Sequence, residues 1–268
     1  MIPAPVRYER AADLDHALAL LAEPDARPIA GGQSLLPVMK LRIARPELLV
    51  DIQRLPLRGV DLRDDGLHIG PLTTWDELSS TQELRRPALV GISECAREIG
   101  DLQVRNRGTI GGSLAHADPA SDMPAVLLAL GATVALRSAQ GGRAVSLADF
   151  LLGPFTTALG EQELITDVVV SVPPSGSGSA YVSVEHPASG FPLAGAAALV
   201  SPIGEAVALT GISGAPLLAR GADIGPILAA ADVLDDRFAS AEYRRHVAGV
   251  VARRALTAAR ARAAEDSG

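Results

Sequence analysis

The sequence predicts an α+β protein with two domains, and three features of the chain support this. Apolar residues recur at helical spacing in some segments, and short apolar runs typical of strands lie between them. Residues 173–179 combine proline, glycine and serine, a composition typical of a linker. Hydrophobic residues make up 48% of the chain, ample material for a buried core. We therefore expect an N-terminal domain over residues 1–174 and a C-terminal domain over residues 180–268.

The N-terminal domain is expected to form two subdomains, of about residues 1–54 and 55–174. In the first, helical spacing and short apolar runs alternate after an opening strand. Pro37 is compatible with the first turn of a helix that begins at Ser34, because its missing N–H would have no partner there. The other expected elements are a helix over residues 11–22 and strands over 27–30 and 48–52.

The second subdomain is expected to open with a hairpin, because two apolar runs flank Asp64-Asp65-Gly66. A later helix is expected to be capped by Ser121, with Asp122 and Pro124 in its first turn. Residues 100–118 are dense in glycine and charge without clear periodicity, so we expect a long structured loop of the kind that is usually functional. The expected strands are 60–62, 67–69, 133–136 and 165–172, and the expected helices are 75–78, 87–99 and 121–130.

The C-terminal domain is expected to contain strand-like runs followed by one long helix. The expected strands are 180–184, 193–200 and 206–212, and the helix spans about 241–260. Several arginines on this helix indicate a solvated face or, alternatively, a docking surface for a partner subunit.

Composition excludes several classes of function. A formal net charge of −7 argues against nucleic-acid binding. The single cysteine, Cys95, excludes a disulfide within the chain and a cysteine-ligated iron–sulfur cluster, and its place in a predicted helix favours a small core residue. The five histidines lack metal-ligand spacing. Without a signal-like start or the ~20 apolar residues of a membrane span, we expect a soluble, cytoplasmic protein.

Two glycine-rich loops are the strongest candidates for a binding site. One runs from Ala30 to Ser34 and the other from Gly108 to Ser113. Consecutive N–H groups in such turns form a concavity that binds anions, and two of them in one domain suit a pyrophosphate. Neither loop fits the Walker or the Gly-x-Gly-x-x-Gly pattern. Taken singly, each loop is equally compatible with an ordinary tight turn.

The sequence around these loops resembles a known family. Residues 30–42 (AGGQSLLPVMKLR) look like the first FAD loop of the medium subunits of molybdenum hydroxylases, and residues 99–125 (IGDLQVRNRGTIGGSLAHADPASDMPA) match the second loop more fully. That family includes aerobic carbon monoxide dehydrogenase, nicotine dehydrogenase and the flavin domain of xanthine dehydrogenase. Weaker similarities follow at residues 153–157, 185–191 and 242–245, so the resemblance covers almost the whole chain.

The resemblance implies a vanillyl-alcohol-oxidase-type (PCMH-type) FAD-binding fold of two subdomains plus a C-terminal α+β domain. It also implies that FAD is bound without a covalent bond and receives electrons from 2Fe-2S clusters on a small subunit. Molybdopterin would lie on a large subunit, where substrate is hydroxylated. The expected assembly is a heterotrimer or a dimer of heterotrimers. Neither the substrate nor the final acceptor (NAD, a quinone or oxygen) follows from this chain.

The resemblance also assigns roles to residues. Asp122 would accept hydrogen bonds from hydroxyls on the flavin side, whereas the residue alone suggests a carboxylate facing a helix dipole. Val104 and Ile165 would pack near the adenine. His116 would touch the flavin or bond to the backbone. No catalytic or metal-binding residue is expected on this chain. The loops would hold the pyrophosphate, with hydroxyls from Ser34 and Thr109, through Ala30, Gly31, Gly32, Gln33, Ser34, Leu35, Thr109, Ile110, Gly111, Gly112 and Ser113.

One departure from the family concerns the run from Tyr181 to Glu185. Many relatives carry a lysine just after the aromatic position, near the flavin, and this run has no cation. Any positive charge that stabilises reduced flavin would have to come from elsewhere.

Two alternatives remain open. A stand-alone flavin oxidase or reductase of the same fold often tethers FAD through a first-loop histidine, where this chain has Gln33, and usually has a larger substrate domain with acid–base residues. A non-catalytic assembly subunit that has lost its flavin is the other, and the intact glycine pairs of both loops argue against it.

Overall fold

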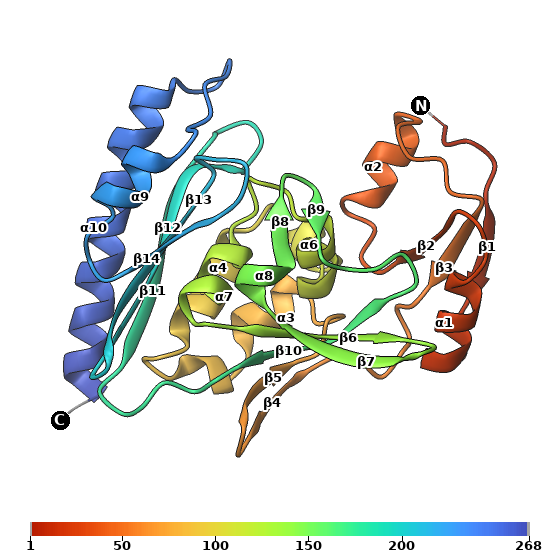
Figure 1. Cartoon of the computed structure of the whole chain (residues 1–268), viewed down its shortest axis with the longest axis horizontal. Helices are drawn as coiled ribbons and strands as arrows, with labels where there is room; N and C mark the ends of the chain where they lie inside the picture. The colour runs from red at the N-terminus through yellow and green to blue at the C-terminus, as the bar shows by residue number, and fades with distance from the viewer. Residues whose placement is uncertain (1, 267–268) are drawn as a thin grey trace.

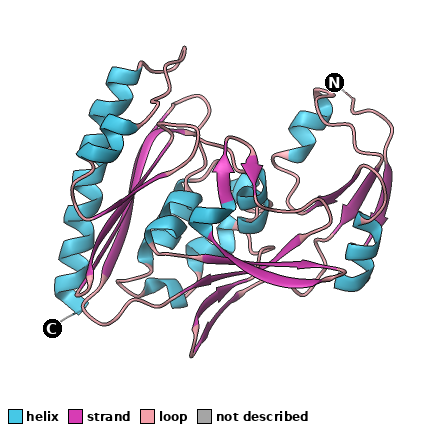
Figure 2. Cartoon of the chain, viewed as in Figure 1, coloured by secondary structure: helices cyan, strands magenta, loops and turns pink. Residues whose placement is uncertain are grey.

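A computed structural model describes residues 2–266, in which the three larger sheets lie side by side along the longest axis of the molecule (Figure 1). The first sheet, near the N-terminus, lies at one end and the sheet covered by the last helix at the other. Helices and strands are interspersed throughout, as expected for an α+β protein (Figure 2).

The N-terminal sheet has three parallel strands in the order β1-β3-β2. Helix α1 begins where the Asp13 carboxylate accepts the N–H of His16 at 2.8 Å, a side-chain N-cap. Buried leucines of α1 pack on the sheet and close this core. The elements are β1 (Arg7–Arg10), α1 (Leu14–Leu21), β2 (Ala26–Ile29), α2 (Leu35–Lys40) and β3 (Leu48–Asp51).

The central sheet is antiparallel, in the order β4-β5-β10-β6-β7, with helices packed over it. The predicted hairpin is present as β4 and β5. The strands are β4 (Val60–Arg63), β5 (Gly66–Ile69), β6 (Thr133–Ser138), β7 (Gly141–Ser146), β10 (Leu164–Val170) and the separate pair β8 (Leu151–Gly153) and β9 (Thr156–Thr157). The helices are α3 (Trp75–Ser80), the 3-10 turn η1 (Glu83–Arg85), α4 (Val90–Glu98), α5 (Leu102–Arg105), α6 (Ile110–His116), α7 (Met123–Ala129) and α8 (Leu147–Phe150).

The C-terminal sheet is sandwiched between helices. Its alternate residues divide between two cores, because successive side chains of a strand point to opposite faces. Ala196 and Ala198 pack against α10, whereas Ala197 and Tyr181 join the core that contains α4 and α7. The elements are β11 (Gly178–Glu185), β12 (Pro192–Ser201), β13 (Gly204–Thr210), β14 (Leu217–Arg220), α9 (Gly225–Ala230) and α10 (Ala241–Asp266).

The interpretation of residues 100–118 as one long loop was wrong, because the segment contains α5 and α6. Gly111 and Gly112 lie inside α6, and glycine disfavours helix by roughly 1 kcal/mol, which conceals the pattern. The Thr109 side chain caps the helix, and Ile110 and Leu114 are fully buried beneath it.

Ser121 is not the N-cap that the sequence suggested. Helix α7 begins at Met123, and Asp122 occupies the N-cap position without a side-chain cap hydrogen bond. The predicted linker is also shorter than expected, since β11 already begins at Gly178. The sequence did not predict β7, β8, β9, β14, α8 or α9.

Candidate functional site

A cavity of about 600 Å³ lies where the two glycine loops meet. This volume is within the range of cofactor sites. Walls come from the loop between β2 and α2, from α6, and from residues 189–191 beyond β11. Of the predicted site residues, Ile110 alone does not line it, since its side chain is fully buried in the core. Those that do are Ala30, Gly31, Gly32, Gln33, Ser34, Leu35, Val104, Thr109, Gly111, Gly112, Ser113, Asp122 and Ile165.

The first loop, residues 31–35, presents a run of backbone N–H groups that donate to no atom of the described chain. It leaves β2 and enters α2, and Gly32 adopts a left-handed φ of 75° that favours glycine. The carbonyl of Gly32 accepts the N–H of Leu36 at 3.1 Å, which fixes the turn. Consecutive free N–H groups in such a turn form an anion-binding concavity.

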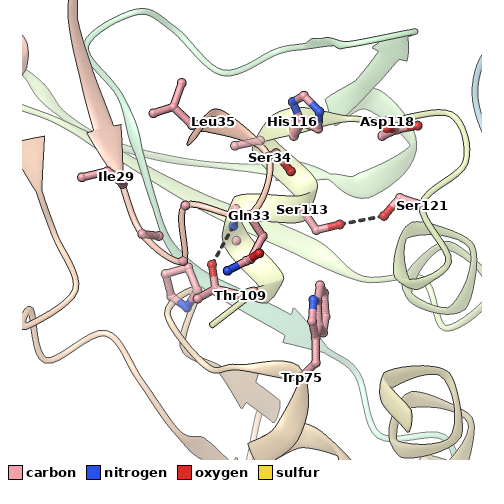
Figure 3. Close-up of a pocket in the computed structure, with 18 of the residues that line it drawn as sticks. Ile29, Gln33, Ser34, Leu35, Trp75, Thr109, Ser113, His116, Asp118 and Ser121 are labelled. Carbon is pink, nitrogen blue, oxygen red and sulfur yellow. Dashed lines mark hydrogen bonds between the residues drawn. The ribbon is translucent and has the colours of Figure 1, made fainter. Parts of the chain in front are cut away.

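The second loop differs, because its N–H groups already have partners. Ile110 donates to the Thr73 carbonyl at 3.1 Å and Gly111 to the Pro71 carbonyl at 2.8 Å. Gly112 donates to the Thr109 hydroxyl at 3.2 Å, a bond that a rotation of the Thr109 side chain would release. Figure 3 shows this bond beside the 2.7 Å contact between the hydroxyls of Ser113 and Ser121. This loop therefore offers chiefly side-chain hydroxyls and a rigid wall.

The glycines of the two loops serve different purposes. A Cβ at Gly31 would lie 1.9 Å from the Arg107 carbonyl oxygen, so this glycine lets the first loop touch the chain that leads into the second. A Cβ at Gly111 would meet Pro71 at 2.4 Å. At Gly112 the Thr109 hydroxyl, 2.9 Å away, is the single neighbour within 4 Å. Both glycines of α6 line the cavity, but Gly112 has room for a side chain there and Gly111 does not.

Asp122 is a buried carboxylate at the cavity wall, with 5% of its surface exposed. One of its oxygens, Oδ1, accepts the Tyr181 hydroxyl at 2.5 Å. Burial raises the pKa of Asp122 to about 7, the nearby Glu185 and Glu98 carboxylates add to the rise, and the Tyr181 hydrogen bond opposes it. The carboxylate does not cap its own helix, so the helix-dipole alternative lacks its expected contact.

Of the other lining residues, Trp75 and Arg27 were not indicated as site residues by the sequence, whereas His116 and Phe191 lie in segments that the resemblance matched. Trp75 lies at the cavity edge (Figure 3), and Arg27 is the sole lysine or arginine among the described lining residues. The His116 ring packs against Phe155 at a tilt of 57°, with 5.1 Å between the ring centroids, and makes no hydrogen bond with the backbone within residues 2–266. Phe191, which belongs to a segment that the resemblance matched weakly, also reaches the cavity. Side chains from distant segments meet here, so spacing along the chain could not reveal them.

Further predictions concern metals, Cys95 and membranes. Within the described part of the chain, no group of His, Cys, Asp and Glu is arranged to hold a metal ion. Cys95 is fully buried in the central core, and burial raises the pKa of its thiol, as expected for a packing residue. Among the described helices, none has the length and apolar character that crossing a bilayer requires.

Comparison with known proteins finds relatives over almost the whole length of the chain. It is 44% identical over 199 residues to the glyceraldehyde dehydrogenase medium chain of Sulfolobus acidocaldarius, covering 74% of this chain and 70% of the relative. It is 36% identical over 287 residues to the carbon monoxide dehydrogenase medium chain of Afipia carboxidovorans, covering 98% and 99%. The solved carbon monoxide dehydrogenase of Hydrogenophaga pseudoflava superposes with a TM-score of 0.91 at 35% identity, covering 98% of this chain and 99% of that one.

The family model described as the FAD binding domain in molybdopterin dehydrogenase matches residues 4–174. That span contains both glycine loops and all but three of the residues that line the cavity, the exceptions being Ser189, Gly190 and Phe191. The family that the sequence resembles is thereby confirmed: the chain belongs to the FAD-binding family of the molybdopterin dehydrogenases.

Proposed function

We propose that this chain binds FAD without a covalent bond and transfers electrons as the medium subunit of a molybdenum-containing dehydrogenase. The observation that carries the proposal is the run of unpaired N–H groups at residues 31–35, facing a cavity that the second loop closes. A pyrophosphate presents the linked anionic oxygens that such a run can bind. The first loop has Gln33 where covalent attachment would use a histidine.

We propose that different lining residues hold the different parts of FAD. The N–H groups of the first loop hold the pyrophosphate, with help from the Ser34 and Thr109 hydroxyls. Val104 and Ile165 pack at the adenine end. Asp122 faces the ribityl hydroxyls with Oδ2, because Oδ1 is engaged by Tyr181. When bound, FAD supplies the redox chemistry that no side chain here can supply. The protein's own task is to bind, orient and shield it.

Electrons would reach this site from another chain. Relatives are named as medium chains of carbon monoxide dehydrogenase and glyceraldehyde dehydrogenase. One cysteine cannot ligate an iron–sulfur cluster, so a small 2Fe-2S subunit and a large molybdopterin subunit are the proposed partners, in a cytoplasmic complex. We further propose that the fold is of the PCMH type, with FAD domain limits at 1–174 and a C-terminal domain at 180–268.

Acid precipitation of the purified protein tests the proposal. We expect one FAD per chain, released into the supernatant as free yellow flavin. Flavin that remains with the pellet would contradict non-covalent binding. A folded apoprotein that takes up no FAD at micromolar concentration would overturn the proposed function itself. Co-expression with the iron–sulfur and molybdopterin subunits, followed by size-exclusion chromatography, tests the assembly, and a chain that never co-elutes with them would exclude it.

A further inference from the structure

We infer that Tyr181 is a positioning residue of the FAD site, which acts by orienting Asp122 from outside the cavity. The inference rests on the proposed function. Tyr181 belongs to β11 of the C-terminal sheet, is 6% exposed and does not line the cavity. Its hydroxyl donates to Oδ1 of Asp122 across the boundary between the C-terminal sheet and α7. The second oxygen, Oδ2, is thereby left for a ligand.

The hydroxyl is held in place by its surroundings on the sheet. A Cβ at Gly195 of β12 would lie 2.4 Å from it, so the absence of a side chain there makes room for the phenol. The Tyr181 N–H donates to the Glu94 carboxylate of α4 at 3.3 Å. That carboxylate also accepts Nη1 of Arg262, on α10, at 2.9 Å. The backbone and the ring of Tyr181 are therefore both held in place without a bound ligand.

Asp122 depends on this donor because its other neighbours oppose the charged form. Asp122 faces Tyr181 and Glu185 from β11, and Glu98 and Cys95 from α4. Burial and the acidic pair raise its pKa, whereas the pKa of Tyr181 is raised well above its usual range, which keeps the phenol a donor. The hydrogen bond from Tyr181 favours the ionised form of Asp122 and holds the carboxylate in one rotamer. Without the phenol, the ionised form of Asp122 is less favoured and the direction of Oδ2 is no longer fixed.

This arrangement makes a distinctive prediction about ligand fragments. Asp122 is proposed to bind the ribityl side of FAD. ADP contains the adenosine and the pyrophosphate but no ribityl flavin, so its affinity should not depend on Asp122. We expect Tyr181→Phe to weaken FAD binding about tenfold, the effect of losing one charge-assisted hydrogen bond. The affinity for ADP should change by less than about twofold. A purely structural tyrosine would affect both ligands alike.

The test is titration calorimetry of FAD and ADP with the wild type and three variants of the full chain. Tyr8→Phe is the matched control, because Tyr8 also donates to a buried aspartate, Asp51, away from the cavity. It should leave the ratio of FAD to ADP affinity unchanged. Gly195→Ala should lower that ratio like Tyr181→Phe, since its Cβ displaces the hydroxyl while the tyrosine remains. It also serves as the second variant if Tyr181→Phe folds poorly.

The outcomes separate this inference from the proposed function. A wild type that binds neither FAD nor ADP means that the proposed function is wrong. If the wild type binds FAD, an unchanged FAD affinity in Tyr181→Phe and Gly195→Ala overturns the role of Tyr181, as does an equal loss of FAD and ADP. A selective loss of FAD in both, absent in Tyr8→Phe, supports it.

Discussion

The two glycine loops look alike in the sequence, but in the structure they differ in whether their backbone N–H groups are hydrogen-bonded. In the first, residues 31–35 leave their N–H groups unpaired. In the second, the N–H groups of Ile110, Gly111 and Gly112 already bond to the protein. A pair of glycines therefore does not by itself identify the anion-binding loop. What identifies that loop is whether its N–H groups already have acceptors in the protein. In the second loop the acceptors belong to segments such as residues 71–73, which lie far away along the chain.

The largest loss of FAD affinity is expected on substitution of Gly31, where the two loops are in contact. In Gly31→Ala the Cβ would lie 1.9 Å from the Arg107 carbonyl oxygen, so the loops must separate. We expect FAD affinity to fall about 100-fold or more and the free energy of unfolding of the apoprotein to drop by about 1–3 kcal/mol. Flavin content after purification and urea denaturation measure the two effects. Full retention of flavin would show that the contact between the loops is dispensable.

Gly112→Val should separate ligand binding from folding. This position opens on the cavity, with the Thr109 hydroxyl as its single close neighbour. We expect FAD affinity to fall roughly 30-fold, equivalent to a loss of about 2 kcal/mol. Stability of the apoprotein should change by under about 1 kcal/mol, the helix-propensity difference. The control is Gly249→Val in α10, a helical glycine whose neighbour within 4 Å is the end of the Arg253 side chain, and it should bind FAD normally. If Gly112→Val binds FAD as tightly as Gly249→Val, this wall does not contact the cofactor.

FAD affinity should depend on pH through Asp122. Because its folded pKa of about 7 exceeds the unfolded value of 3.8, this group stabilises the folded apoprotein most below the unfolded value, and that contribution is lost as the pH rises through 7. FAD hydroxyls donate to the carboxylate, so binding should strengthen by about tenfold between pH 5.5 and pH 8. Fluorescence titration at several pH values measures this. Asp122→Asn should flatten the profile, and an unchanged slope in that variant would assign the titration to another group.

The smallest loss of FAD affinity is expected on substitution of Arg27, the cation at the cavity edge. Arg27 is exposed, and its guanidinium has no hydrogen-bond or ion-pair partner within residues 2–266. Its attraction to the pyrophosphate is screened by solvent, so Arg27→Gln should weaken FAD binding about threefold. The salt dependence of FAD affinity should also become less steep. Dissociation constants at low and at high ionic strength test this, and equal salt dependence in both proteins would exclude the contact.

Much of the fold was predictable because its elements bury regular apolar faces. The strands β3, β5 and β12 and the helices α1 and α10 follow from apolar runs and spacing. Helix α6 did not, since its glycines weaken helix propensity and the stability comes from tertiary contacts of Ile110 and Leu114. Strand β7 begins with two glycines, is largely exposed and pairs with β6 alone, so it had no apolar alternation to detect.

The glycine loops of the site could be predicted from the sequence, but several lining residues from other segments could not. The two loops were found through local glycine patterns and the resemblance. The segments that the resemblance matched contain most of the residues that line the cavity. Arg27 of β2 and Trp75 of α3 reach the same cavity through tertiary packing, which no local pattern encodes. The partner of Asp122 was missed for the same reason, because Tyr181 is 59 positions away along the chain.

Amide hydrogen exchange with and without FAD tests the contrast between the loops most directly. Free N–H groups exchange quickly in the apoprotein and slow down when a ligand accepts their hydrogen bonds. We expect residues 31–35 to exchange fast without FAD and to gain strong protection with it. Residues 110–112, whose N–H groups are already bonded, should be protected in both states and change little. Protection gained at residues 110–112 with none at 31–35 would contradict the assignment of the first loop as the pyrophosphate site.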